Sequence, residues 1–211
     1  MKLKTRSLLY ERVKPTKDAK LIVIYCEGKK REKDYFNYFV ELNQKIKLEV
    51  EEPSHDDNNS PNGLYEKAVS HIIKSEENPN PKYEIYDEIW LVFDTDKWGE
   101  QIDTVREECK QKGWNVAQSN PCFEVWLYYH LFEFEEFDGM EIAENWKSFV
   151  NKKISGGFDS RKHPVLIKTA ISNSKKAFDK NIIIGSTEIY KLAENFYPYI
   201  SEQIESALQN M

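Results

Sequence analysis

Short apolar segments in the first half of the chain predict four β-strands. Residues 21–26 and 89–93 are continuous runs of aliphatic and aromatic residues, typical of strands buried on both faces of a parallel sheet. Residues 46–50 alternate between apolar and charged positions, which indicates a strand with one polar face. Residues 114–117 form a fourth short run, after a glycine at position 113. We therefore expect a sheet whose central strands are apolar throughout.

Between these strands, apolar residues recur at the three- and four-residue spacing of helices. This spacing predicts helices over residues 35–42, 64–73 and 102–109. Strands and helices therefore alternate, and such alternation implies right-handed crossovers and a sheet covered on both faces. We predict an α/β fold with a mostly parallel four-stranded sheet flanked by helices.

The second half of the chain carries helical patterns. Ser119 or Asn120 is expected to cap a helix that has Pro121 at its first position and is apolar nearly all round, so this helix should be buried. Further helices are predicted over residues 142–150, 164–178 and 187–208. The last helix has an apolar stripe that either packs on the domain or forms a dimer seam, and we expect core packing. The stripe consists of Ile189, Leu192, Phe196, Ile200 and Ile204.

These patterns divide the chain into three parts. Residues 1–19 are polar and basic without periodicity, and we interpret them as an arm that orders when something binds it. Residues 20–132 form the predicted α/β domain, which the resemblance described below makes Toprim-like. Residues 133–211 form a helical extension packed on that domain.

Composition predicts a soluble protein of the cytoplasm. Charged residues make up 31% of the chain, and no apolar run approaches the roughly 20 residues that span a bilayer. The N-terminal residues do not resemble a secretory signal. The three cysteines, Cys26, Cys109 and Cys122, have no CxxC spacing and are expected to be reduced, with Cys26 in the core.

The charge distribution permits binding to nucleic acid although the net charge is −6. Residues 1–33 hold 11 Lys and Arg against 4 Asp and Glu, and residues 147–180 hold 9 against 2. Two basic segments on an acidic body could follow a phosphate backbone, although either could equally be ordinary solvated surface. The candidate nucleic-acid-binding residues are Lys29, Lys30, Arg31, Arg161, Lys162 and Lys168.

Three carboxylates at predicted strand ends are the main candidates for chemistry. Glu27 follows the first strand, and Asp94 and Asp96 follow the third. Because parallel sheets of this type place their sites at the carboxyl ends of strands, these acids are expected at one edge. Carboxylate oxygens suit Mg²⁺ or Mn²⁺, which can neutralise charge on a phosphoryl group and orient a water. The alternatives are a polar turn for Asp94 and Asp96, and a plain strand-to-helix turn at Glu27.

These motifs resemble two known patterns. A strand followed by Glu27-Gly28 and another followed by Asp94-Thr95-Asp96 is similar to the Toprim domain of primases, topoisomerases and nucleases. More narrowly, four stretches resemble the RloB-like family: Cys26-Glu27-Gly28 with Glu32 and Tyr35-Phe36; Phe93-Asp94-Thr95-Asp96; Ser119-Asn120-Pro121-Cys122-Phe123-Glu124-Val125-Trp126-Leu127; and Ser186-Thr187-Glu188-Ile189-Tyr190. One departure is Arg31, which stands where the family commonly has Thr and could contact phosphate.

The resemblance implies an activity. Residues that match Glu27 act as a general acid/base or metal ligand in Toprim proteins, and those that match Asp94 and Asp96 hold Mg²⁺. RloB-like proteins are linked to bacterial defence against phage, and related Toprim proteins work with an ATPase or cut tRNA. The leading hypothesis is a Mg²⁺-dependent nuclease acting on RNA or DNA, with RNA such as tRNA favoured. The alternatives are a nucleotidyl transfer enzyme, or a scaffold without catalysis that binds nucleic acid or a partner ATPase.

Other polar residues have weaker claims. Glu124 either joins the acid cluster as a catalytic residue or binds backbone N–H groups at a helix start. His130 is expected to be a core histidine, and His163 to mark a helix boundary. His55, with Asp56 and Asp57, lies in a polar loop that is expected to be solvated. The chain has neither a Walker A motif nor GxGxxG, so we do not expect it to hydrolyse ATP.

Overall fold

The computed structural model describes most of the chain. The described residues are 12–16, 18–51, 59–77, 87–95, 98–136, 139–178 and 182–209. Asp96 and the loop residues His55, Asp56 and Asp57 lie outside these ranges, as do residues 1–11 of the basic arm.

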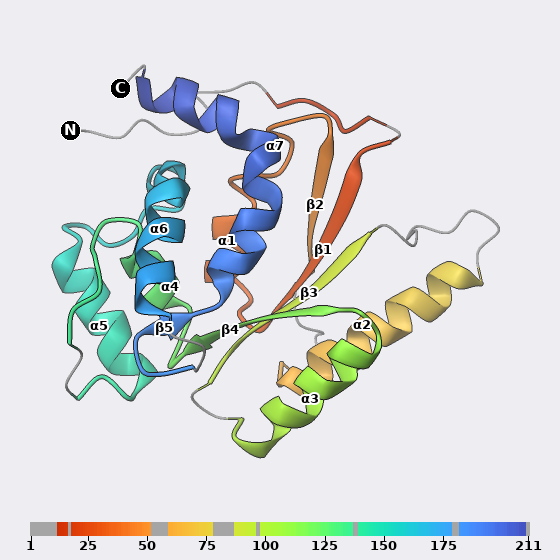
Figure 1. Cartoon of the computed structure of the whole chain (residues 1–211), viewed down its shortest axis with the longest axis horizontal. Helices are drawn as coiled ribbons and strands as arrows, with labels where there is room; N and C mark the ends of the chain where they lie inside the picture. The colour runs from red at the N-terminus through yellow and green to blue at the C-terminus, as the bar shows by residue number, and fades with distance from the viewer. Residues whose placement is uncertain are drawn as a thin grey trace.

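A five-stranded sheet forms the centre of the molecule (Figure 1). Its strands lie in the order β2-β1-β3-β4-β5. They are β1 (Lys20–Cys26), β2 (Ile46–Glu51), β3 (Glu88–Asp94), β4 (Asn115–Asn120) and β5 (Ser186–Thr187). The first four are parallel, whereas β5 is antiparallel to β4. The predicted α/β fold with a mostly parallel sheet is confirmed, and β5 adds a fifth strand.

The apolar runs are continuous because the sheet separates two hydrophobic cores. Ile22, Ile24 and Cys26 of β1 point into one core, while the intervening residues point into the other. Successive side chains of a strand alternate between the faces of a sheet, so both sets must be apolar.

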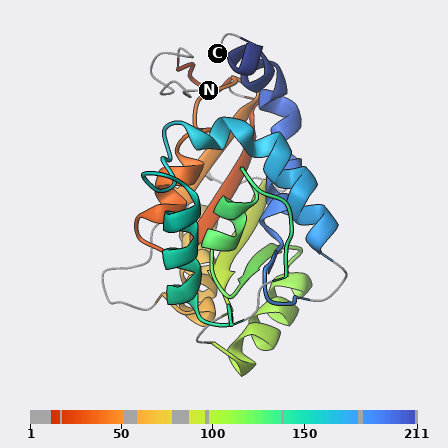
Figure 2. The ribbon, with the colours of Figure 1, turned by 90° about the vertical axis from the view of Figure 1, so that its left-hand side faces the viewer.

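Helices cover both faces unequally (Figures 1 and 2). The smaller core lies beneath α2 (Pro61–Glu76) and α3 (Glu100–Gln111). The larger core lies beneath the remaining α-helices, which stand together in front of the sheet in Figure 2. They are α1 (Arg31–Phe36), α4 (Glu124–Tyr128), α5 (Ala143–Lys153), α6 (Ile167–Ala177) and α7 (Ile189–Gln209).

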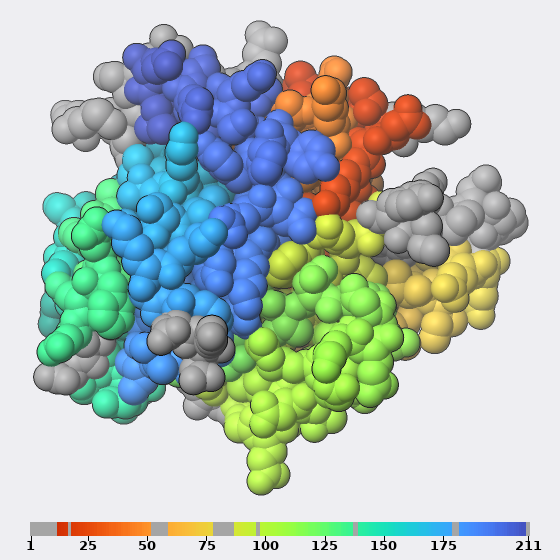
Figure 3. Space-filling model, viewed as in Figure 1, coloured from red at the N-terminus to blue at the C-terminus, as the bar shows by residue number. Residues whose placement is uncertain are grey.

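The last helix confirms the expected core packing. All five residues of its apolar stripe are fully buried in the larger core. Figure 3 shows α7 beside α6 on the surface of the molecule. In the described part of the chain, no helix is long and apolar enough to cross a membrane.

Two predicted local structures are wrong. Ser119 and Asn120 belong to β4, and the Ser119 hydroxyl lies 2.8 Å from that of Thr187, so neither caps the following helix. The helix α4 begins at Glu124 instead of Pro121, and its N-cap, Phe123, makes no side-chain cap. The other error concerns residues 35–42.

The helix predicted over residues 35–42 begins and ends earlier. The helix α1 ends at Phe36, and the amides of Tyr38 and Phe39 then bond to carbonyls three residues back. Glu41 has a φ of 60°. Tyr35 and Phe36 lie in α1, whereas the apolar residues after Asn37 lie on turns, so helical spacing alone placed the helix too far along the chain.

Candidate functional site

Glu27 and Asp94 meet at the carboxyl ends of adjacent parallel strands. Cys26 of β1 is in register with Val92 of β3, so the residues that follow each strand emerge at the same edge. The Glu27 carboxylate accepts hydrogen bonds from the Asp94 backbone N–H at 2.9 Å and from the Trp98 indole N–H at 3.0 Å. The strand pattern therefore predicted their juxtaposition correctly, and Glu27 is held in one orientation.

A pocket of about 230 Å³ opens at this edge of the sheet. Four carboxylates line it: Glu27, Glu32, Asp94 and Glu124. Three are buried, with exposed fractions of 8% for Glu27, 6% for Glu32 and 8% for Glu124. Glu27 directly follows β1, Glu32 belongs to α1, Asp94 ends β3 and Glu124 begins α4, so the sheet edge and two helices supply the acids together.

Gly28 makes room for one of these acids. A Cβ at this position would collide with the carboxylate of Glu32. Any other residue at position 28 would displace the Glu32 carboxylate from its place over the turn after β1. The Glu-Gly pair serves close packing within the pocket, beyond a simple turn.

The pocket favours positive charge. Burial, together with the carboxylates of Glu124 and Glu27, raises the pKa of Glu32 to about 7, although a backbone hydrogen bond and Lys147 oppose the rise. Burial also raises the pKa of the Cys122 thiol, again with help from Glu124 and Asp94. Negative charge is thus costly here for two different groups, and a cation would relieve that cost.

Basic residues line the same pocket above the acids. Lys29, Lys30 and Arg31 are exposed and follow directly after the turn at Gly28. Lys147 of α5 is exposed at the rim. Partial desolvation lowers its pKa, but the acidic groups around it, Glu124 foremost, together raise the pKa more, so Lys147 stays cationic. An acidic floor and a basic rim suit a phosphodiester together with a cation.

In the second basic segment, residues 147–180, some basic residues lie near the pocket and others lie elsewhere on the surface. Arg31 donates to the Phe158 carbonyl at 3.5 Å, which places the loop with Arg161 and Lys162 next to the rim. Both of these residues pair with Asp159. Lys168 does not line the pocket and pairs with Glu205 of α7 at 2.8 Å. The expected phosphate contact of Lys168 therefore finds no support in its position.

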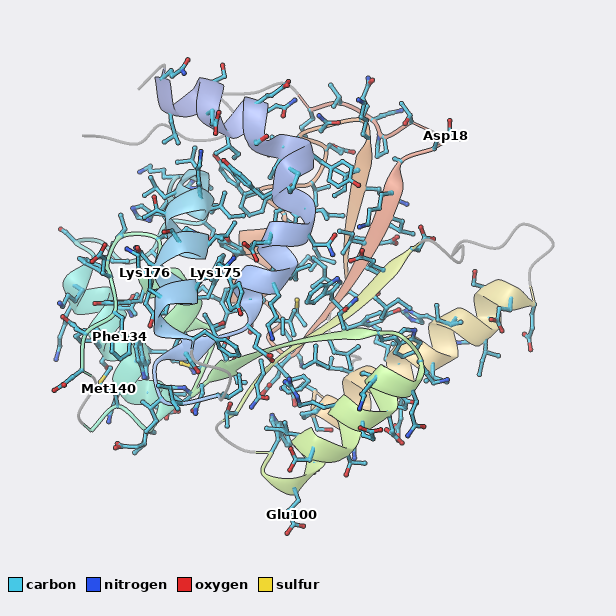
Figure 4. All side chains as sticks on the ribbon, viewed as in Figure 1. Asp18, Glu100, Phe134, Met140, Lys175 and Lys176 are labelled. Carbon is cyan, nitrogen blue, oxygen red and sulfur yellow. The ribbon has the colours of Figure 1, made fainter. Side chains whose placement is uncertain are left out.

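Other basic residues of this segment tie α6 to its surroundings. Figure 4 labels Lys175 and Lys176 of α6. Lys175 pairs with Glu194 of α7 and Lys176 pairs with Glu133. Exposed pairs of this kind contribute little stability, so these lysines are ordinary solvated surface.

His130 is a core histidine, as predicted. Its Nε2 lies 3.1 Å from the Tyr35 hydroxyl and its Nδ1 lies 3.1 Å from the Trp126 carbonyl. Burial lowers the pKa of His130 to about 3, so the ring is neutral. His163 begins the 3-10 helix His163–Leu166, which confirms it as a boundary residue.

Carboxylate oxygens are the donors that hard cations prefer, and four carboxylates line the pocket. Among the described residues, however, no three Asp, Glu, His or Cys side chains converge as metal ligands. Asp96, the third predicted ligand, lies outside the described residues.

Sequence reasoning missed three lining residues: Glu32, Lys147 and Asn59. Glu32 belongs to the first motif, five residues after Glu27, and could have been found there. Lys147 lies in an amphipathic segment like many others, and Asn59 lies in a polar loop. Only the packing of α5 on α4, and of α2 near the sheet edge, brings these residues to the pocket.

Together, the fold and the pocket define an α/β protein with an acidic, lysine-rimmed site at the carboxyl ends of parallel strands. A family model described as RloB-like protein matches residues 22–196. The chain therefore belongs to the RloB-like family, as its motifs indicated. Comparison with curated proteins and with solved structures gives no match.

Proposed function

We propose that the chain is a metal-dependent nuclease that cuts nucleic acid, with RNA such as tRNA favoured, in defence against phage in the bacterial cytoplasm. The arrangement of the pocket carries this proposal. Its floor combines buried Glu27, Glu32 and Glu124 with Asp94, and its rim carries lysines and Arg31. Family membership supports the link to defence.

In this proposal, the acids on the floor of the pocket bind the cation and the basic residues at its rim bind the nucleic acid. Asp94 and Asp96 would hold Mg²⁺ or Mn²⁺, with Glu27 and Glu124 beside them. The bound ion would neutralise charge that develops on the phosphoryl group. Lys29, Lys30, Arg31 and Lys147 would bind phosphate oxygens and hold the strand across the pocket.

Glu27 would act through its fixed orientation. Its carboxylate is anchored by hydrogen bonds from the Asp94 backbone amide and from the Trp98 indole. A carboxylate held in this way can accept a proton from an attacking water or ligate the ion. A partner ATPase from the same defence locus would release the activity on infection.

A cleavage assay tests the proposal. Purified protein is incubated with labelled tRNA, single-stranded RNA and DNA, each with Mg²⁺ or Mn²⁺ and with EDTA. We expect metal-dependent cleavage that falls by about 100-fold or more in Asp94→Asn, because several kcal/mol of charge stabilisation is lost. The matched control is Glu205→Gln, which removes an exposed carboxylate that pairs with Lys168 away from the pocket.

Phage infection of cells carrying the gene provides the second arm. We expect protection with the wild type and with Glu205→Gln, and none with Asp94→Asn or Glu27→Gln. Full protection by Asp94→Asn and Glu27→Gln would contradict the enzyme and favour a scaffold role. Primer extension in place of cleavage would indicate nucleotidyl transfer.

A further inference from the structure

The late family motif around Glu188 has no part in the pocket lining, yet Glu188 is almost fully buried. Its carboxylate accepts two hydrogen bonds from the Arg106 guanidinium of α3, at 2.7 and 3.1 Å. It also accepts a bond from Lys191 at 2.6 Å and a long one, at 3.4 Å, from the Gln118 backbone N–H. The motif therefore anchors an arginine at the flank of β4.

The anchored arginine orients the side chain of Gln118. Arg106 donates to the Gln118 side-chain carbonyl at 3.1 Å. The Gln118 amide nitrogen then donates to the Thr95 hydroxyl at 2.8 Å. Because one end of the amide faces a cation and the other an acceptor, its orientation is determined. Gln118 is itself buried, so replacing these bonds by water is costly.

Thr95 is the residue between Asp94 and Asp96. Its hydroxyl donates to the Ser119 carbonyl at 2.8 Å, and its N–H lies 2.9 Å from that carbonyl and 3.1 Å from the Pro121 carbonyl. The chain of bonds from Glu188 through Arg106 and Gln118 thus ends on Thr95, which begins the loop after β3. It approaches this loop from β4, the neighbouring strand on the side away from Glu27.

We propose that Glu188, Arg106 and Gln118 are positioning residues that hold Thr95, and with it the Asp94 carboxylate, in the orientation that binds the cation. The cation site rests on the proposed function, whereas the holding of the loop does not. Residues that support metal ligands commonly change metal affinity by about 10- to 100-fold when they are replaced.

Two readouts on the intact protein test this role. The first is hydrogen exchange at the Thr95 amide relative to amides in the middle of β3, and the second is Mn²⁺ affinity measured by titration calorimetry. In Gln118→Met, we expect Thr95 to exchange at least about 10-fold faster while the middle of β3 stays protected, and Mn²⁺ to bind about 10-fold more weakly.

The controls separate positioning from general destabilisation. Lys191→Met removes another partner of Glu188 without touching Gln118 or Thr95, and should leave both readouts unchanged. Thr95→Ser keeps the hydroxyl and should retain wild-type values, whereas Thr95→Val should behave as Gln118→Met. Unchanged exchange and affinity in Gln118→Met would overturn the proposal. So would an equal rise in exchange throughout β3, since that indicates only a loss of fold stability.

The design also distinguishes this inference from the proposed function. If the wild type binds no Mn²⁺ and cuts nothing, the proposed function fails. The exchange measurements still decide whether the Glu188 network holds the loop.

Discussion

Two groups of buried carboxylates lie on opposite sides of Asp94 and Thr95, and they differ in the charges that surround them. Around Glu188, one carboxylate meets Arg106 and Lys191, and these partners keep its pKa below the usual value although burial acts to raise it. In the pocket, Glu32 lies among other acids, and its pKa rises to about 7.

The difference separates a structural ion network from the pocket in which we propose that a cation binds. A buried charge that the protein neutralises itself contributes to holding elements together, as Glu188 does for α3, β4 and the start of α7. In the pocket, Lys147 offsets the acids around Glu32 only in part, and a carboxylate whose pKa is raised in this way is a candidate for a functional site. Both groups come from motifs of the family, so a motif alone does not reveal which kind it encodes.

The largest expected effect is a pH-dependent gain of stability in Glu32→Gln. The folded pKa of Glu32, about 7, lies above its usual 4.5. The contribution of Glu32 to stability is therefore complete below pH 4.5 and is lost as the pH rises through about 7. The variant, compared with the wild type, should gain about 3 kcal/mol between pH 4.5 and pH 8.

Denaturant unfolding at the two pH values, in EDTA, measures this gain. Glu205→Gln is the control, because it removes an exposed carboxylate outside the pocket. If Glu32→Gln gained nothing at pH 8, the pocket acids would be compensated in the same way as Glu188, and the contrast between the two regions would disappear.

A smaller effect, a loss of stability, is expected when a partner of Glu188 is removed. Arg106→Met leaves Glu188 buried with Lys191 as its remaining charged partner. We expect a loss of about 2 kcal/mol at pH 7, below the roughly 3–5 kcal/mol of a fully buried pair because the Arg106 side chain is 35% exposed. Thermal and denaturant unfolding give the value, and Lys110→Met, which breaks an exposed pair with Glu107, should cost almost nothing. Equal losses in the two variants would contradict a special role for the buried pair.

The smallest expected effect is the stabilisation of the folded protein by Mn²⁺, which tests whether the pocket and not the Glu188 group binds the cation. Mn²⁺ at ten times its dissociation constant should stabilise the wild type by about 1.4 kcal/mol, since it binds only the folded state. The stabilisation should vanish in Asp94→Asn and persist in Lys191→Met, which changes the charge balance only around Glu188. Melting curves with and without Mn²⁺ provide the measurement. Equal stabilisation of the wild type and Asp94→Asn would place the cation outside the pocket.

The order of elements and the meeting of Glu27 with Asp94 could be predicted from the sequence alone. Both depend on local periodicity and on a general property of parallel sheets, in which the carboxyl ends of neighbouring strands share an edge. The ends of short elements were predicted less well. Ser119 and Asn120 have the chemistry of helix caps, but both residues belong to β4 and pair with β5.

Tertiary structure determined which residues line the pocket and which form the chain of hydrogen bonds from Glu188 to Thr95. Glu32, Lys147 and Glu124 reach one cavity because α1, α4 and α5 pack on the same face of the sheet. Arg106 finds Glu188 across 82 positions of the chain. Periodicity reports which side of an element is apolar and carries no information about which distant side chain lies opposite. Local pattern therefore determined the sheet and the edge at which Glu27 and Asp94 meet, while the long-range packing of helices determined which carboxylates lie beside cations and which lie beside other acids.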